Sequence, residues 1–87
     1  MDLTSPTLLD EVKVVLVDTL GIADRAASID ATTELLGSLP ELDSMAVLEL
    51  VAALEQRFAI AVDDDDVTAE VFETLGSLTA FVAAKRS

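Results

Sequence analysis

The chain of 87 residues contains no cysteine, histidine, tryptophan or tyrosine. Without histidine or cysteine it has no Ser-His or Cys-His nucleophile pair, no zinc site, no disulfide and no redox thiol. Its three phenylalanines are too few to form an aromatic platform for nucleic acid bases. We therefore do not expect a self-contained enzyme.

Basic residues are also scarce, five against seventeen acidic ones, and the net charge is -12. Nucleic-acid binding depends on Lys and Arg neutralising phosphates, so this function is excluded. The longest apolar runs have five residues, far short of the roughly 20 that span a bilayer. The acidic first residues lack the basic and apolar regions of a signal peptide. We expect a cytoplasmic monomer without a membrane span.

Apolar residues make up 52% of the chain, enough for a folded core, and the length predicts a single domain over residues 1–87. Apolar periodicity and cap residues predict helices over residues 6–20, 44–58 and 75–85, with a short one over 69–72. Ser5 and Pro6 are the expected start of the first helix, and Thr74 the expected cap of the last. The fold class is therefore all-α, a small four-helix bundle of three long helices and one short helix.

Residues 21–43 form a long first loop with no sustained period, and Thr33 is a candidate cap for a single turn within it. Gly37 and Pro40 punctuate the approach to the second long helix. We expect the loop to lie over the core, held at intervals by apolar side chains. These are Ile22, Ile29, Leu35, Leu36, Leu39 and Leu42.

Helix 44–58 has two apolar faces when its residues are placed at 100° intervals. The predicted core face consists of Val47, Leu50, Val51, Leu54 and Phe58. The second face consists of Ser44, Met45, Leu48 and Ala52, with Glu49, Glu55 and Gln56 beside it. Either the first loop covers this second face, or the face docks a basic partner. Residues 41–73 hold ten acidic residues and one basic residue, which modestly favours docking.

Four consecutive aspartates at positions 63–66 suggest a calcium loop, because Ca²⁺ prefers carboxylate oxygens. An EF-hand loop beginning at Asp63 would need Gly where Thr68 stands and Glu where Thr74 stands. We therefore interpret the run as a solvated acidic turn and expect no metal site.

Asp43 and Ser44 stand at the start of helix 44–58, and both residue types are ordinary N-caps. As a cap, Ser44 needs no further function. As a functional residue it cannot activate itself, because the chain has no histidine. Modification by another enzyme remains, and the positive end of a helix would suit a product phosphate.

The stretch Leu42-Asp43-Ser44-Met45, followed by Val47-Leu48-Glu49-Leu50-Val51-Ala52-Ala53-Leu54-Glu55 and Phe58, resembles the signature of acyl carrier proteins. Residues 68–82 are similar to the third and fourth helices of that family. The resemblance implies that Ser44, in an Asp-Ser-Leu-type motif, receives 4'-phosphopantetheine from coenzyme A, and that the arm's thiol holds an acyl group as a thioester. It also implies that the second long helix recognises partners, with Met45, Leu48, Glu49, Ala52 and Glu55 at matching positions.

The implied partners are a phosphopantetheinyl transferase that uses magnesium, an acyl ligase or acyltransferase, and ketosynthase-type enzymes with basic docking surfaces. The implied pathways are fatty-acid, polyketide or related specialised biosynthesis. Three departures from the family pattern stand out: Met45 in place of Leu, Ala46 in place of an acidic residue, and a longer spacing from Gly37 to Asp43. The longer spacing resembles free-standing carriers of specialised bacterial clusters.

Two other functions remain open from the sequence. A peptidyl or aminoacyl carrier of a non-ribosomal peptide system would share the fold, Ser44 and the arm. An unmodified acidic interaction module would need the docking face and no modified serine.

Overall fold

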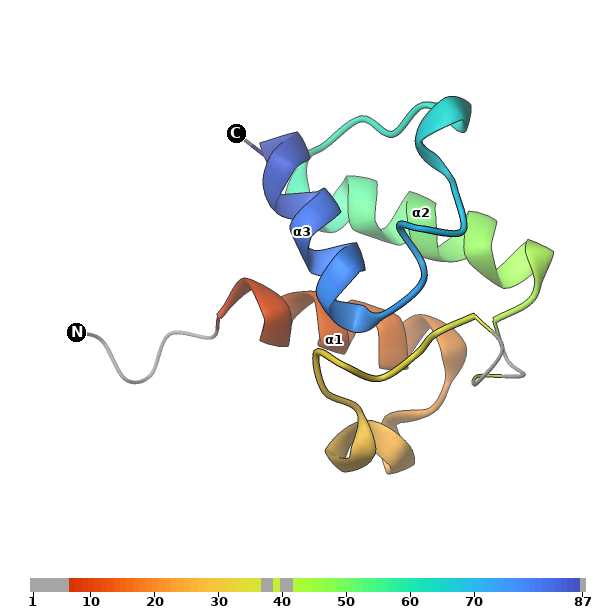
Figure 1. Ribbon diagram of the computed structural model, residues 1–87, viewed down its shortest axis with the longest axis vertical. Helices are drawn as coiled ribbons and strands as arrows, with labels where there is room; N and C mark the ends of the chain where they lie inside the picture. Colours follow the sequence, from red (N-terminus) through yellow and green to blue (C-terminus); the bar gives the residue numbers. More distant parts are fainter. Residues whose placement is uncertain (1–6, 37–38, 40–41, 87) are drawn as a thin grey trace.

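The computed structural model describes residues 7–36, 39 and 42–86. Three α-helices dominate it: α1 (Leu8–Leu20), α2 (Ser44–Phe58) and α3 (Leu75–Arg86), with two short 3₁₀ helices, η1 (Ala23–Ser28) and η2 (Asp64–Asp66) (Figure 1). Within these described ranges there is no strand, and the single β-bridge joins Glu34 to Thr74. The expected all-α bundle of three long helices is confirmed.

Helix α1 begins two residues later than predicted, because Thr7 is its N-cap. The Thr7 hydroxyl accepts the Asp10 N–H at 3.1 Å, and the Asp10 carboxylate faces the Thr7 N–H at 3.4 Å. This reciprocal capping box satisfies two donors that the first helical turn leaves open. The predicted start at Ser5 and Pro6 lies outside the described residues. At the other end, Gly21 stops the helix as predicted, with a left-handed φ of 69°.

Helices α1 and α2 lie side by side and run antiparallel, and α3 crosses both (Figure 1). Their facing sides form the core, whose largest fully buried side chains come from all three helices and from the first loop. These are Val12, Leu16, Leu35, Leu50, Leu54, Leu75, Leu78 and Val82. On the inner side of α3, Leu75, Leu78 and Val82 are buried, and Phe81 is half-buried beside them.

The core face of α2 is rotated slightly from the predicted one. Leu50 and Leu54 are buried as expected, whereas Val47, Val51 and Phe58 are half-buried. Ala46, which the sequence did not place in the core, is buried. It lines a groove together with Thr19 and Leu20, so the end of α1 covers one side of the first turn of α2.

The first loop follows the core as expected, since Ile22, Ile29, Leu35, Leu39 and Leu42 are buried. Leu36 is the exception and keeps 37% of its surface exposed. Leu36 lies in a turn after the bridge residue Glu34, and its side chain lines an open groove together with Ala69 and Glu73. Gly37 and Pro40, the predicted breaks in this loop, lie outside the described residues.

Backbone hydrogen bonds join this loop to the start of α3. The Leu35 N–H donates to the Glu73 carbonyl at 2.9 Å, and the Leu75 N–H donates to the Thr33 carbonyl at 3.1 Å. The Thr33 side chain, predicted to cap a following turn, instead bonds back to Asp30, whose N–H it accepts at 2.8 Å. The first loop is therefore fixed by α3 as well as by apolar anchors.

The short helix predicted over residues 69–72 is present as a hydrogen-bonded turn. The Thr68 hydroxyl accepts the Val71 N–H at 3.4 Å, and the Phe72 N–H donates to the Thr68 carbonyl at 3.4 Å. Thr74 caps α3 as predicted, accepting the Ser77 N–H at 3.0 Å. No helix among the described residues is long and apolar enough to cross a membrane.

Candidate functional site

Asp43 is the residue that caps α2, and Ser44 is the first residue of the helix. The Asp43 carboxylate accepts the Ala46 N–H at 2.8 Å, which satisfies one of the donors left open at a helix start. Ser44 is exposed, and its hydroxyl makes no hydrogen bond with the described part of the chain. Capping within the described residues therefore does not explain Ser44, an exposed residue at the positive end of α2.

The backbone leading into Asp43 is fixed by the core. Leu39 and Leu42 are buried, and the Leu42 N–H donates to the Leu39 carbonyl at 3.0 Å. The Asp43 carbonyl then accepts the Val47 N–H at 2.9 Å, the first regular bond of the helix. The Ser44 hydroxyl is thus presented by a rigid helix end with a buried anchor directly before it.

A phosphodiester fits this position. The first N–H groups of α2 and its dipole favour an anion there, and the first turn of α2 carries no acidic residue. Asp43 is the nearest carboxylate in sequence, and one of its oxygens is already occupied by the Ala46 N–H. The site can therefore accommodate a phosphate ester on Ser44 without displacing any hydrogen bond between described residues.

The second face of α2 is open to solvent. Met45 keeps 66% of its surface exposed and Leu48 keeps 60%, and Ala52 is exposed one turn further on. The interpretation that the first loop covers this face is therefore wrong. Together with Ser44, these three side chains form what we call the exposed strip, an apolar surface that starts at the candidate serine.

The two carboxylates beside the exposed strip have different surroundings. Glu49 is exposed, whereas Glu55 is half-buried and accepts the Val62 N–H at 2.9 Å. Glu55 therefore holds the segment that follows α2, in addition to any role at the surface. The sequence could not indicate this bond, because a helical projection of residues 44–58 contains no information on where residue 62 lies.

The acidic run after α2 has a structural role at one of its ends. Asp66 lies 2.7 Å from the Lys85 ammonium and also accepts the Asp63 N–H at 3.1 Å. The hydrogen bond with Lys85 lowers the pKa of Asp66, and the same bond raises the pKa of Lys85. The pair ties η2 to the end of α3. Across the described ranges, no three acidic side chains are grouped closely enough to hold a metal ion.

Comparison with known proteins gives matches along most of the chain. A family model described as a phosphopantetheine attachment site matches residues 10–82. An acyl carrier protein of Chlamydia trachomatis serovar D is 30% identical over 82 residues, covering 93% of this chain and 99% of its own. An acyl carrier protein of Sulfurovum sp. is 38% identical over 76 residues, covering 86% of this chain and 93% of its own.

A solved structure shows the same similarity in three dimensions. The solution structure of a holo acyl carrier protein from Nitrosomonas europaea has a TM-score of 0.84 and 46% sequence identity. The match covers 92% of this chain and 96% of the other. The similarity in sequence and the similarity in fold thus both extend over almost the whole chain.

Proposed function

The chain belongs to the acyl carrier protein family, whose members are non-catalytic carriers with a covalently attached phosphopantetheine, and on this premise we propose that Ser44 bears that group. One observation carries the assignment: Asp43 performs the capping that Ser44 could have performed, so the Ser44 hydroxyl is exposed and has no structural task among the described residues. Asp43 supports the site by fixing the helix end on which Ser44 stands.

The proposed function is to carry acyl intermediates and present them to successive enzymes of fatty-acid, polyketide or related specialised biosynthesis. The phosphopantetheine, delivered from coenzyme A by a phosphopantetheinyl transferase, supplies the thiol that this cysteine-free chain lacks. The protein's own residues anchor the arm, favour its phosphate through the helix end, and offer a surface for docking. A tethered acyl group gains a high effective concentration at whichever active site the carrier reaches.

The exposed strip and Glu49 support the proposed docking. Enzymes with basic surfaces would be steered by the net charge of -12 and would contact Met45, Leu48 and Ala52 directly. We propose the transferase, an acyl ligase or acyltransferase, and ketosynthase-type enzymes as the partners. Glu55, placed on this face by the sequence, would act mainly by holding Val62. We further propose that the chain works as a monomeric carrier domain in the cytoplasm.

The test is an intact-mass measurement. The apo protein is incubated with coenzyme A, magnesium and a broad-specificity phosphopantetheinyl transferase, with Ser44→Ala as the matched variant. The proposal expects a single phosphopantetheine mass step on the wild type and none on the variant. A wild type that stays at its apo mass, as an unmodified interaction module would, contradicts it, and so does an equal step on Ser44→Ala.

A further inference from the structure

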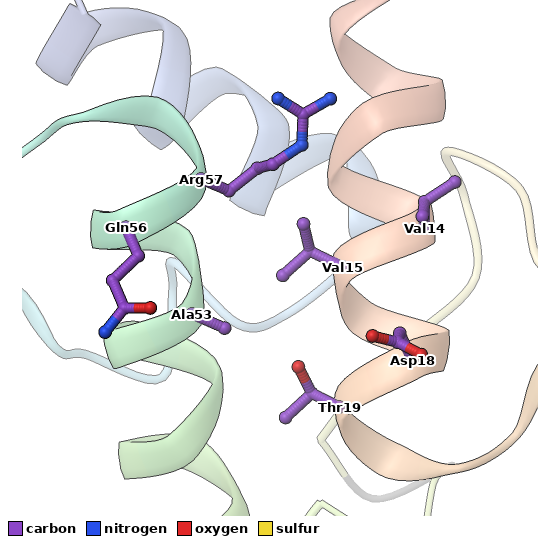
Figure 2. A pocket seen from close by; sticks show the side chains of 7 residues that line it. All are labelled: Val14, Val15, Asp18, Thr19, Ala53, Gln56 and Arg57. Atoms are coloured by element: carbon purple, nitrogen blue, oxygen red, sulfur yellow. The ribbon is translucent and has the colours of Figure 1, made fainter.

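A groove between α1 and α2 lies on a different side of α2 from the exposed strip. It has a volume of about 390 Å³, and its walls include Val15 and Thr19 from α1 and Ala53 from α2. Figure 2 shows these three side chains facing one another between the two helices. Leu48, in the exposed strip, and Ala53 are five residues apart on α2, which places them about 140° apart around the helix. The two surfaces are therefore separate, and we call the groove the α1 groove.

The edge of the α1 groove contains an apolar side chain that the core does not use. Val14 keeps 61% of its surface exposed, whereas its neighbours Val12, Val15, Leu16 and Val17 are buried. Covering Val14 with a partner would remove apolar surface from water, which favours association. The α1 groove therefore offers an apolar contact on the outer side of α1.

The charges that line the α1 groove cancel, in contrast to the charges of the chain as a whole. Asp18 and Arg57 are the charged residues among those that line it, whereas the net charge of the chain is -12. Two other grooves on the described surface contain acidic residues and no basic one. A purely basic partner surface would place one of its positive charges against Arg57. The charges of the α1 groove instead fit a partner that carries both signs.

The two charges lie towards opposite ends of the α1 groove, with Val14 between them (Figure 2). Arg57 donates from its guanidinium to the Glu11 carboxylate at 3.0 Å, which fixes it beside the first part of α1. Glu11 precedes Asp18 by seven residues, two helical turns or about 10 Å along α1. A second helix beside α1 would therefore meet the two charges with side chains seven residues apart. Apolar residues three or four positions from each would meet Val14.

Both charged side chains can still bind a partner. Glu11 uses one N–H of the Arg57 guanidinium, but this group has five, and the side chain is 53% exposed. Asp18 is exposed, and its carboxylate makes no hydrogen bond or ion pair within the described ranges. Neither residue would have to give up an existing bond when a partner docks.

We propose that the α1 groove docks an amphipathic helix of a partner protein. This helix would lie along α1, with an acidic side chain at Arg57, a basic one at Asp18 and apolar side chains between them against Val14 and Ala53. Such helix-in-groove recognition depends on apolar anchors every three or four residues. Because the exposed strip stays open, a carrier held in this way keeps Ser44 accessible to its enzymes. The α1 groove thus holds the carrier in an assembly, and this role does not depend on the modification of Ser44.

A titration of the unmodified, ¹⁵N-labelled full chain with a synthetic peptide tests the proposal. The probe is an alanine-based helix of about four turns, held helical by a staple on its outer side. It carries one Lys and one Glu seven residues apart, with two Leu between them. We expect saturable shifts of the amide signals of Val14, Asp18 and Ala53. Shifts centred on Met45 and Leu48, or no saturable shift, would overturn the proposal.

A second peptide separates specific docking from general attraction to an acidic chain. In this dibasic peptide a Lys replaces the Glu, so that it carries two positive charges and no negative one. General attraction to a net charge of -12 favours the dibasic peptide, whereas docking in the α1 groove places its second Lys against Arg57. We expect the neutral peptide to bind about threefold more tightly. Equal affinities, or tighter binding of the dibasic peptide, would contradict the proposal.

Matched protein variants test where the neutral peptide binds. Val14→Ser and Leu36→Ser each shorten an exposed apolar side chain without a change in charge, the first in the α1 groove and the second outside it. The dissociation constant should rise about fivefold for Val14→Ser and stay unchanged for Leu36→Ser. Equal losses of affinity would contradict docking in the α1 groove. Without peptide, amide shifts of Val14 and Ala53 that depend on protein concentration would assign the groove to a second copy of the chain and overturn the proposal.

Discussion

The Asp43 carboxylate accepts the backbone N–H of Ala46 at 2.8 Å. This bond assigns the cap of α2 to Asp43 and leaves the adjacent serine, Ser44, as an exposed first residue of the helix. The sequence allowed either residue to be the cap. The structure therefore separates a structural residue from a candidate functional one at neighbouring positions.

The first prediction follows from this separation. Replacing Asp43 by Ala should lower the free energy of unfolding by about 1 kcal/mol, the usual cost of losing a side-chain N-cap. Ser44→Ala should leave stability within about 0.5 kcal/mol, because no cap is lost. Urea denaturation followed by circular dichroism measures both. Equal destabilisation by the two variants would show that Ser44 shares the capping role, and Asp43→Asn, which can still cap, serves as the control.

The second prediction concerns the two glutamates beside the exposed strip. Glu55→Ala removes the acceptor of the partly buried Val62 N–H and should cost about 1–3 kcal/mol of stability. Glu49→Ala removes an exposed side chain and should change stability by less than about 0.5 kcal/mol. Thermal or urea unfolding decides between these outcomes. A stable Glu55→Ala protein would mean that the bond to Val62 contributes little.

The third prediction isolates docking from folding. Since Glu49 is exposed, Glu49→Lys should keep the helicity of the wild type while slowing modification by a transferase with a basic surface. The rate should also depend less on salt, because one attractive charge has become repulsive. Asp24→Lys makes the same charge change of two units at an exposed residue of η1, away from α2, and serves as the control. If both variants slow the modification equally, the net charge of the protein, and not the exposed face of α2, governs its encounter with the transferase.

The fourth prediction is the pH dependence of the Asp66–Lys85 pair. The pKa of Asp66 is lowered in the folded protein, so its contribution to stability is complete above the ordinary Asp pKa and is lost as the pH falls through the lowered value. The pKa of Lys85 is raised, so its contribution is lost only as the pH rises through that raised value. The difference in unfolding free energy between wild type and Asp66→Asn should therefore shrink on acidification. A difference that stays constant from neutral to acidic pH would contradict this pairing.

The fifth prediction concerns Gly76 in the first turn of α3. A Cβ at this position would lie 2.9 Å from the Ala31 carbonyl oxygen, which also accepts the Gly76 N–H at 2.9 Å. Gly76→Ala should therefore destabilise the protein, although the same change in an open helix usually gains up to about 1 kcal/mol. Denaturation curves of the two proteins at equal pH show whether the substitution lowers or raises the free energy of unfolding. A stabilised variant would show that the first loop can move away from α3 without cost.

Much of this fold could be predicted from the sequence, because helix periodicity and end signals are local. The end of α1 at Gly21, the end of α2 at Phe58 and the Thr74 cap all depend on residues within one turn. The two 3₁₀ helices were missed, since pieces of three to six residues show no period. The start of α1 was misplaced because Ser5 and Thr7 are both acceptable caps and local pattern does not rank them.

Contacts between distant segments could not be predicted in the same way. Burial of Ala46 depends on the end of α1, and the Glu55 bond depends on the path of the chain to Val62. The candidate site was predictable in its main residue, because Ser44 follows a recognisable cap and opens an apolar strip. Its surroundings arise from the packing of the end of α1 against the start of α2 and have no signature in either helix alone.

Attachment of the phosphopantetheine to Ser44 is proposed for one of six serines in the chain. The most direct measurement is fragmentation mass spectrometry of the modified protein after reaction with coenzyme A and a transferase. We expect fragment ions to place the added mass on Ser44 and on no other serine. Assignment of the modification to any other residue would contradict it.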